Sequence, residues 1–298
     1  MRAAAASGTL IPSLAIVVGG VFWGLFWLPI RWLSETGLAG GWPGAAILAA
    51  TLLLLLPMAV LRWNQLRTYW LPLAGCALFT GTAFAFYSIS LQLTEVVRCI
   101  LLFYLTPVWS TALGLALLGE RLTFARIAAL LLGAAGLLVV LGFGAQFPWP
   151  RNIGDWLALG SGLAWAYGSL KLYRMGAVAV PEQILTFIIG SLVVALAAIA
   201  IGGPAFGGTP DGAALRAAAP YALLAALYVL PMVWLTLWPT TLLSPGRVGI
   251  LLMSEVVVGV ASAATLSGEP FGAREALGAA LIIGAGLVEV LGQGAVVE

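Results

Sequence analysis

Histidine is absent from this chain of 298 residues, and its one lysine is Lys171. The missing histidine excludes sites that use an imidazole as metal ligand, proton relay or catalytic base. Because Lys171 follows a leucine, the chain also lacks the Gly-Lys-Ser/Thr signature of a phosphate-binding loop. The sequence therefore predicts no metal site, no cofactor and no ATPase motif.

Charge is scarce as well, since only 8% of the residues are charged and 62% are hydrophobic. A soluble domain has about 25% charged residues, and this composition leaves too few polar groups to cover a soluble surface. The net charge of +2 indicates no polyanionic partner, so we expect no nucleic-acid binding. Cys76 and Cys99 both lie in apolar segments, which indicates packing and not a disulfide framework.

Long apolar runs dominate the sequence instead. Each is long enough, at about 20 residues, to cross the hydrocarbon core of a bilayer as a helix. We therefore predict an all-α membrane protein with ten transmembrane helices, joined by loops too short to fold as separate domains. The predicted spans are 9–31, 43–61, 69–90, 95–118, 124–143, 154–173, 181–202, 217–238, 244–266 and 274–293.

The two halves of the chain resemble each other. A segment that begins with Arg98 and ends with Gly119-Glu120 matches, at the same spacing, one that begins with Arg247 and ends with Gly268-Glu269. Each half holds an odd number of spans, five, so the second half enters the membrane from the opposite side. This predicts two inverted five-helix repeats, an architecture typical of secondary transporters. The predicted halves are residues 1–146 and 147–298.

The distribution of basic residues predicts the orientation. More Lys and Arg residues flank the spans on the N-terminal side of the membrane than on the opposite side. Loops rich in Lys and Arg stay in the cytoplasm. We therefore expect a multi-pass protein of the cell inner membrane with both termini cytoplasmic.

A family resemblance rests on the fourth span. The run Arg98–Pro107, followed by Leu118-Gly-Glu-Arg-Leu-Thr123, resembles the drug/metabolite transporter superfamily, and within it the EamA-type ten-span exporters. Val21-Phe-Trp-Gly24 in the first span fits the same pattern, and the branch that the chain resembles most is the aromatic amino acid exporters. The resemblance implies an exporter of small metabolites, often amino acids. With the inverted repeat, it predicts alternating access around a midplane cavity.

Two other functions stay open at this point. A drug or sugar transporter could use the same scaffold. A membrane enzyme acting on lipid-linked substrates is disfavoured, because such enzymes cluster acidic or histidine side chains for metal and acid–base work. Here Asp155 and Asp211 both lie near predicted loops. We therefore predict that the protein is not an enzyme.

Two charged residues within spans are candidates for transport. A charged side chain costs about 2.5–3.5 kcal/mol at the bilayer centre on insertion scales. Arg98 lies in the first turn of its span, so it either captures a substrate carboxylate or extends to the interface. Glu255 lies mid-span and predicts a group that carries a proton or binds a substrate ammonium. Its alternative is a structural hydrogen bond or ion pair to another helix, for example to Arg98.

Aromatic side chains inside the spans predict an apolar cavity that suits an amphipathic or aromatic substrate. For each of them, helix packing or lipid contact is the alternative. The predicted substrate-binding set is Trp23, Trp27, Tyr87, Arg98, Tyr104, Trp165, Tyr228, Met232 and Glu255.

Two prolines lie centrally in predicted spans, Pro107 in the fourth and Pro231 in the eighth. Proline removes a helical hydrogen bond and tends to kink the helix. Both are predicted kinks, which either act as hinges or are passive. The position equivalent to Pro107 in the second half is Val256, so the ninth span is expected to lack a kink.

Overall fold

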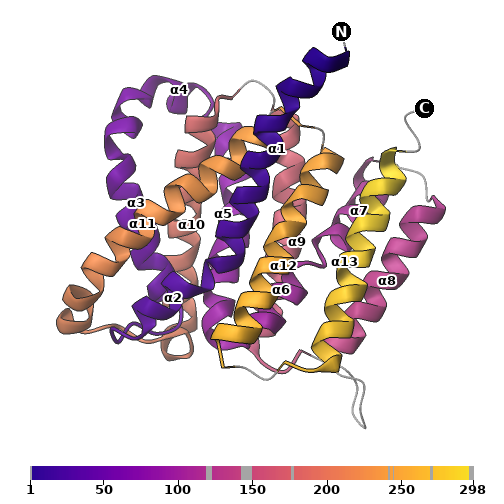
Figure 1. The fold of residues 1–298 in the computed structure, drawn as a ribbon. Coiled ribbons are helices and arrows are strands. Elements are labelled where there is room, and N and C mark those ends of the chain that lie inside the picture. Colours follow the sequence, from indigo (N-terminus) through magenta and orange to yellow (C-terminus); the bar gives the residue numbers. More distant parts are fainter. Residues whose placement is uncertain are drawn as a thin grey trace.

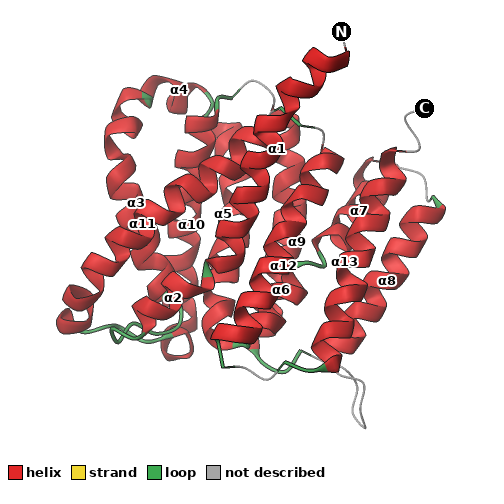
Figure 2. Ribbon diagram, in the orientation of Figure 1, coloured by secondary structure: helices red, strands yellow, loops and turns green. Residues whose placement is uncertain are grey.

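The computed structural model describes residues 2–118, 123–141, 150–175, 178–240, 242–243, 245–268 and 271–294, and every regular element in these ranges is helical (Figure 2). Helices suit an apolar chain, because each backbone group finds its hydrogen-bond partner within its own segment. The elements are α1 (Arg2–Leu25), α2 (Trp27–Ser34), α3 (Trp42–Leu61), α4 (Trp63–Thr68), α5 (Trp70–Leu93), α6 (Val96–Phe103), α7 (Thr106–Leu118), α8 (Phe124–Leu141), α9 (Ile153–Met175), α10 (Val180–Gly202), the 3₁₀ helix η1 (Gly203–Phe206), α11 (Gly212–Thr240), α12 (Pro245–Leu266) and α13 (Ala273–Gly294).

The described part of each predicted span falls on a helix or, for 9–31 and 95–118, on two successive helices. Within the described residues, five helical segments are long and apolar enough to cross a membrane. They are Leu10–Ser34, Trp42–Leu61, Trp70–Leu93, Val180–Phe206 and Gly212–Thr240, with shorter apolar helices at Ile127–Gly136 and Leu251–Leu266. The all-helical fold is thereby confirmed, while the ten-span inverted repeat stays a prediction.

The helices of the two predicted halves interleave in one bundle. Helix α5 packs against α9 and α10, α1 against α11 and α12, and α3 against α10 and α11. Helices α6 and α7 pack against α9, and α8 pairs with α13 at one edge of the bundle (Figure 1). The start of α1 and the end of α13 lie at the same end of the bundle (Figure 1).

The fourth predicted span is broken at Tyr104 and Leu105, between α6 and α7. Proline has no backbone N–H, so Pro107 cannot donate to the carbonyl of Phe103, four residues earlier. The hydroxyl of Thr106 donates to that carbonyl instead, at 2.7 Å. Helix α12, by contrast, is continuous through Val256, as its sequence predicts.

Helices approach most closely where glycine removes a side chain. A Cβ at Gly24 of α1 would lie 2.7 Å from the Glu255 carbonyl oxygen and 2.7 Å from the Gly259 nitrogen of α12. A Cβ at Gly162 of α9 would lie 2.6 Å from the carbonyl oxygen of Phe103. Small residues at such crossings let helix backbones meet, as is common in membranes.

Gly119-Glu120, Glu269 and the boundary after residue 146 lie outside the described residues.

Candidate functional site

A cavity of about 130 Å³ lies where α1, α5 to α7 and α9 to α12 converge. About 10–15 Å³ of such volume holds one water, so there is room for roughly ten waters, the scale of a small metabolite. Its lining residues are Trp23, Ala83, Phe84, Tyr87, Phe103, Tyr104, Thr106, Trp165, Phe187, Thr236, Leu252 and Glu255.

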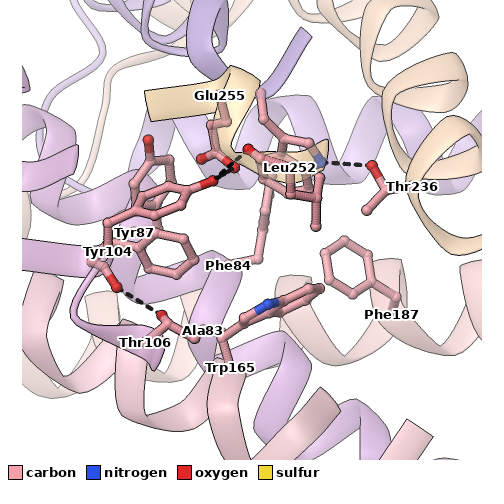
Figure 3. Close-up of a pocket in the computed structure, with 12 residues that line it drawn as sticks. Ala83, Phe84, Tyr87, Tyr104, Thr106, Trp165, Phe187, Thr236, Leu252 and Glu255 are labelled. Carbon is pink, nitrogen blue, oxygen red and sulfur yellow. Dashed lines mark hydrogen bonds between the residues drawn. The ribbon is translucent and has the colours of Figure 1, made fainter. Parts of the chain in front are cut away.

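Glu255 supplies the one carboxyl group among these lining residues, and none of them is a lysine or arginine. Its side chain is only 5% exposed. The Tyr104 hydroxyl lies 2.7 Å from Glu255 Oε2 and 3.0 Å from the carbonyl oxygen of Leu252 (Figure 3). The other carboxyl oxygen, Oε1, is buried with no hydrogen-bond partner in the described part of the chain. The cavity is therefore lined by a carboxyl group with one oxygen fixed by Tyr104 and one buried oxygen without a partner among the described residues.

Aromatic rings form a continuous wall around the rest of the cavity. Trp23 meets Phe84 edge-on with ring centroids 5.5 Å apart, and Phe84 meets Phe187 at 5.5 Å. Trp165 and Phe187 lie across the cavity from Glu255 (Figure 3). Such walls suit the apolar body of an amphipathic ligand.

A hydrogen bond across two helices fixes one side of this wall. Trp23 Nε1 donates to Thr236 Oγ1 at 2.9 Å, and the Thr236 hydroxyl donates to the Met232 carbonyl at 2.8 Å. The indole of α1 is thereby held against α11.

Thr236→Val is expected to destabilise the protein by about 0.5–2 kcal/mol, because the Trp23 N–H loses its acceptor in an apolar region. The measurement is thermal unfolding of the purified protein. Thr265→Val is the matched control, since its hydroxyl bonds only within its own helix and is exposed. Equal unfolding temperatures for the two variants would show that the Trp23–Thr236 bond contributes nothing.

The structure brings five of the nine predicted site residues into the cavity: Trp23, Tyr87, Tyr104, Trp165 and Glu255. Three others lie outside it and hold helices together. Trp27 donates from Nε1 to Ser262 Oγ of α12 at 3.0 Å, and the Tyr228 hydroxyl donates to the Phe22 carbonyl. Met232 is fully buried in the core.

Arg98 is the fourth predicted residue outside the cavity. Its Nε lies 2.8 Å from both carboxylate oxygens of Asp155, at the start of α9. Asp155 also accepts from the Thr94 hydroxyl at 2.8 Å and the Arg151 backbone N–H at 2.7 Å. Arg98 is 3% exposed and Asp155 is 0% exposed, so the pair is buried. Asp155 therefore neutralises the guanidinium inside the protein.

The two predicted hinges lie in different surroundings. Pro107 is in the first turn of α7, beside the break that carries Tyr104 and Thr106 to the cavity. Pro231 lies inside α11, which is continuous around it. Their roles as hinges stay predictions.

Sequence reasoning missed several lining residues. Ala83 and Phe84 lie four and three positions before Tyr87, and Leu252 lies three before Glu255, so helical spacing from the predicted residues finds them. Phe103 and Thr106 flank the break beside Tyr104, and Thr236 follows Met232 by one turn. Phe187 lies four residues after Gln183 and four before Ser191, so the polar side chains of α10 mark its face, which the sequence analysis did not use.

Comparison with known protein families found a match to the first part of the chain. Residues 10–142 match the model of the EamA-like transporter family. The matched segment is just under half of the chain and indicates a membrane transporter of small molecules. The resemblance predicted from the fourth span is thereby confirmed for this segment, while the narrower likeness to aromatic amino acid exporters stays a prediction.

A solved structure described only as "Crystal structure of protein" covers 95% of this chain and 98% of its own length, with a TM-score of 0.59 and 20% identity. At that identity the likeness shows a shared fold over nearly the whole chain. No curated protein matches the sequence.

Proposed function

We propose that the whole chain is a secondary transporter that exports small amphipathic metabolites by alternating access around the cavity. One observation carries the proposal: an aromatic cavity with a buried carboxyl group lies between helices of both predicted halves. A site at the meeting of two halves can open to either side when one half rocks against the other.

The packing of the helices supports the inverted repeat. An exchange of the halves replaces α1 with α9, α3 with α10, α5 with α11, α6 and α7 with α12, and α8 with α13. The α5–α9 contact then becomes α11–α1, the α5–α10 contact becomes α11–α3, and the α1–α12 contact becomes that of α9 with α6 and α7. All of these pairs are in contact. We infer that residues 1–146 and 147–298 are the two repeats of a ten-span bundle.

The orientation is inferred from charge. Helix α4, which contains Arg67, lies at the same end of the bundle as the N-terminus (Figure 1). Because basic loops stay cytoplasmic, both termini are placed on the cytoplasmic side of the cell inner membrane.

Amino acids, aromatic ones first, are the proposed substrates. The side chain of an aromatic amino acid would lie against Trp165, Phe84 and Phe187, and its ammonium would meet Glu255. A drug-like amphipathic molecule fits the same walls and is the alternative. A sugar is less suited, because many polar groups of the lining already bond to protein atoms, namely those of Trp23, Tyr104, Thr106 and Thr236.

Glu255 is the proposed proton carrier. When the carboxyl group is ionised, the Tyr104 hydroxyl donates to its Oε2. When it is protonated, Oε2 can donate to Tyr104, whose own proton then turns to the Leu252 carbonyl 3.0 Å away. The same three groups keep Oε2 hydrogen-bonded in either protonation state, so the proton can be exchanged there without moving a helix.

The test is uptake of labelled tryptophan and phenylalanine into proteoliposomes that contain only this protein, with and without an imposed pH gradient. We expect saturable uptake that the gradient drives beyond equilibrium. Glu255→Gln is expected to abolish the accumulation, because an amide cannot carry the proton. Accumulation that survives in Glu255→Gln would show that another group couples transport. Absence of flux for any amino acid or amphipathic drug would overturn the proposed function.

A further inference from the structure

We propose that the cavity selects organic cations, namely amines without a free carboxylate, over zwitterionic amino acids of the same skeleton. This rests on the proposed function and deepens it: the ammonium is the group that the cavity recognises, and amino acids are carried with lower affinity than the corresponding amines. It follows from the balance of charged groups around the cavity.

The negative charge at the cavity comes from one carboxyl group. Glu255 lines the cavity, is 5% exposed and leaves Oε1 without a hydrogen-bond partner in the described residues. Tyr104 fixes Oε2 at 2.7 Å, so the free oxygen is held in place. A buried carboxylate needs a cation or donors to offset its desolvation. A ligand ammonium supplies both.

Among the lining residues, no cation awaits a ligand carboxylate, because none of them is basic. Three basic side chains of the described part of the chain have partners outside the cavity. Arg98 pairs with Asp155, and Arg31 donates to the Ser267 carbonyl at 3.0 Å. Lys171 lies over the rings of Phe79 and Tyr167, at 5.9 and 5.6 Å from their centroids. A substrate carboxylate would therefore be buried near Glu255 as a second, unpaired anion.

The aromatic wall adds to the same preference. Ring faces carry negative electrostatic potential and attract ammonium groups within about 6 Å. Three aromatic rings lie in a row next to Glu255. The ring centroids of Tyr87 and Phe103 are 5.0 Å apart, and those of Phe103 and Tyr104 are 5.5 Å apart. The faces of these rings stabilise a cation beside the carboxylate, and their negative potential disfavours an anion there.

The experiment compares four ligands that share a phenyl ring on a short chain. They are 2-phenylethylamine as cation, phenylalanine as zwitterion, 3-phenylpropanoate as anion and 2-phenylethanol as neutral control. Dissociation constants are measured by titration calorimetry at pH 7 on the full chain in lipid nanodiscs. Trimethyl(2-phenylethyl)ammonium, a fixed cation that does not leak through lipid, serves for uptake into proteoliposomes.

On the unaltered chain, 2-phenylethylamine is expected to bind at least tenfold more tightly than phenylalanine, and 3-phenylpropanoate most weakly. Glu255→Gln is expected to weaken binding of the amine at least tenfold and to leave 2-phenylethanol within twofold. Glu182→Gln is the matched control, since Glu182 is a buried carboxyl group that pairs with Arg62 outside the cavity. It should leave the amine's affinity unchanged.

Each outcome of this experiment either supports or overturns the proposed charge selection. Phenylalanine binding as tightly as the amine, with amino-acid flux intact, would overturn the charge selection and leave the transporter. Unchanged amine affinity in Glu255→Gln would remove Glu255 as the partner. Should that variant not fold, the ligand series on the unaltered chain still decides. Absence of binding and flux for every solute would overturn the proposed function itself.

Discussion

Replacing Arg98 with glutamine is expected to lower the free energy of unfolding by about 3–5 kcal/mol, because it leaves the Asp155 carboxylate buried without its cation. The carboxylate is 0% exposed and cannot turn to water. Its remaining donors, Thr94 and the Arg151 backbone N–H, are neutral. Thermal unfolding and the yield of folded protein measure the loss.

The double variant Arg98→Gln/Asp155→Asn is the matched control. It removes both charges while the asparagine oxygen can still accept from Thr94, so we expect it to recover most of the lost stability. Comparison of the single and double variants also distinguishes two roles for Arg98. A structural partner lowers the unfolding temperature when lost, whereas a substrate ligand raises the KM for carboxylate substrates at unchanged stability. The second pattern would show that Arg98 leaves Asp155 during transport.

The Arg98–Asp155 pair shows where sequence reasoning reaches its limit. The sequence marked Arg98 because an intramembrane charge needs a partner, and it offered a substrate carboxylate, the interface or Glu255. The partner, Asp155, lies 57 residues away and occupies the first turn of α9, close to a predicted loop. Pairing between residues on different spans depends on how helices pack, and the apolar pattern of each span does not record it.

The helices themselves could be predicted, because a span needs about 20 apolar residues and leaves a clear trace in the sequence. The break at Tyr104 and Leu105 follows from Pro107, which lacks an N–H. The bend at Phe26 between α1 and α2 has the same kind of signal, which the sequence analysis did not use: Pro29 cannot donate to the Leu25 carbonyl four residues earlier, and the Phe26 N–H bonds to the Trp23 carbonyl at 3.1 Å.

The lining of the cavity could be predicted only where a residue stands out from its span. Glu255, Tyr104 and Trp165 do, because polar or indole groups within apolar helices need a reason. Phe187 does not, since the sequence of a phenylalanine that faces lipid is the same as that of one that faces a cavity, and only Gln183 and Ser191 mark its face of α10. The sequence therefore predicted the polar and indole groups of the site better than the apolar residues that line the cavity.

Gly24→Ala is expected to destabilise the protein by about 1–3 kcal/mol and to impair transport. The added Cβ would lie 2.7 Å from the Glu255 carbonyl oxygen and 2.7 Å from the Gly259 nitrogen. Both are backbone atoms of α12, so no side chain can turn away and the two helices must separate. Trp23 and Glu255 stand on these helices and both line the cavity, so the separation reaches the site. Unfolding temperature and initial uptake rate are the measurements.

Gly284→Ala in α13 is the control, because a Cβ there meets nothing within 4 Å. It should change stability by less than about 0.5 kcal/mol. Gly162→Ala tests the corresponding contact in the other half, since its Cβ would lie 2.6 Å from the Phe103 carbonyl oxygen at the end of α6, beside the break. If the halves are inverted repeats, α1 on α12 and α9 on α6 are equivalent contacts, and both alanine variants should lose comparable stability. A Gly24→Ala protein as stable as Gly284→Ala would contradict this prediction, because it would show that α1 and α12 can separate without loss of stability.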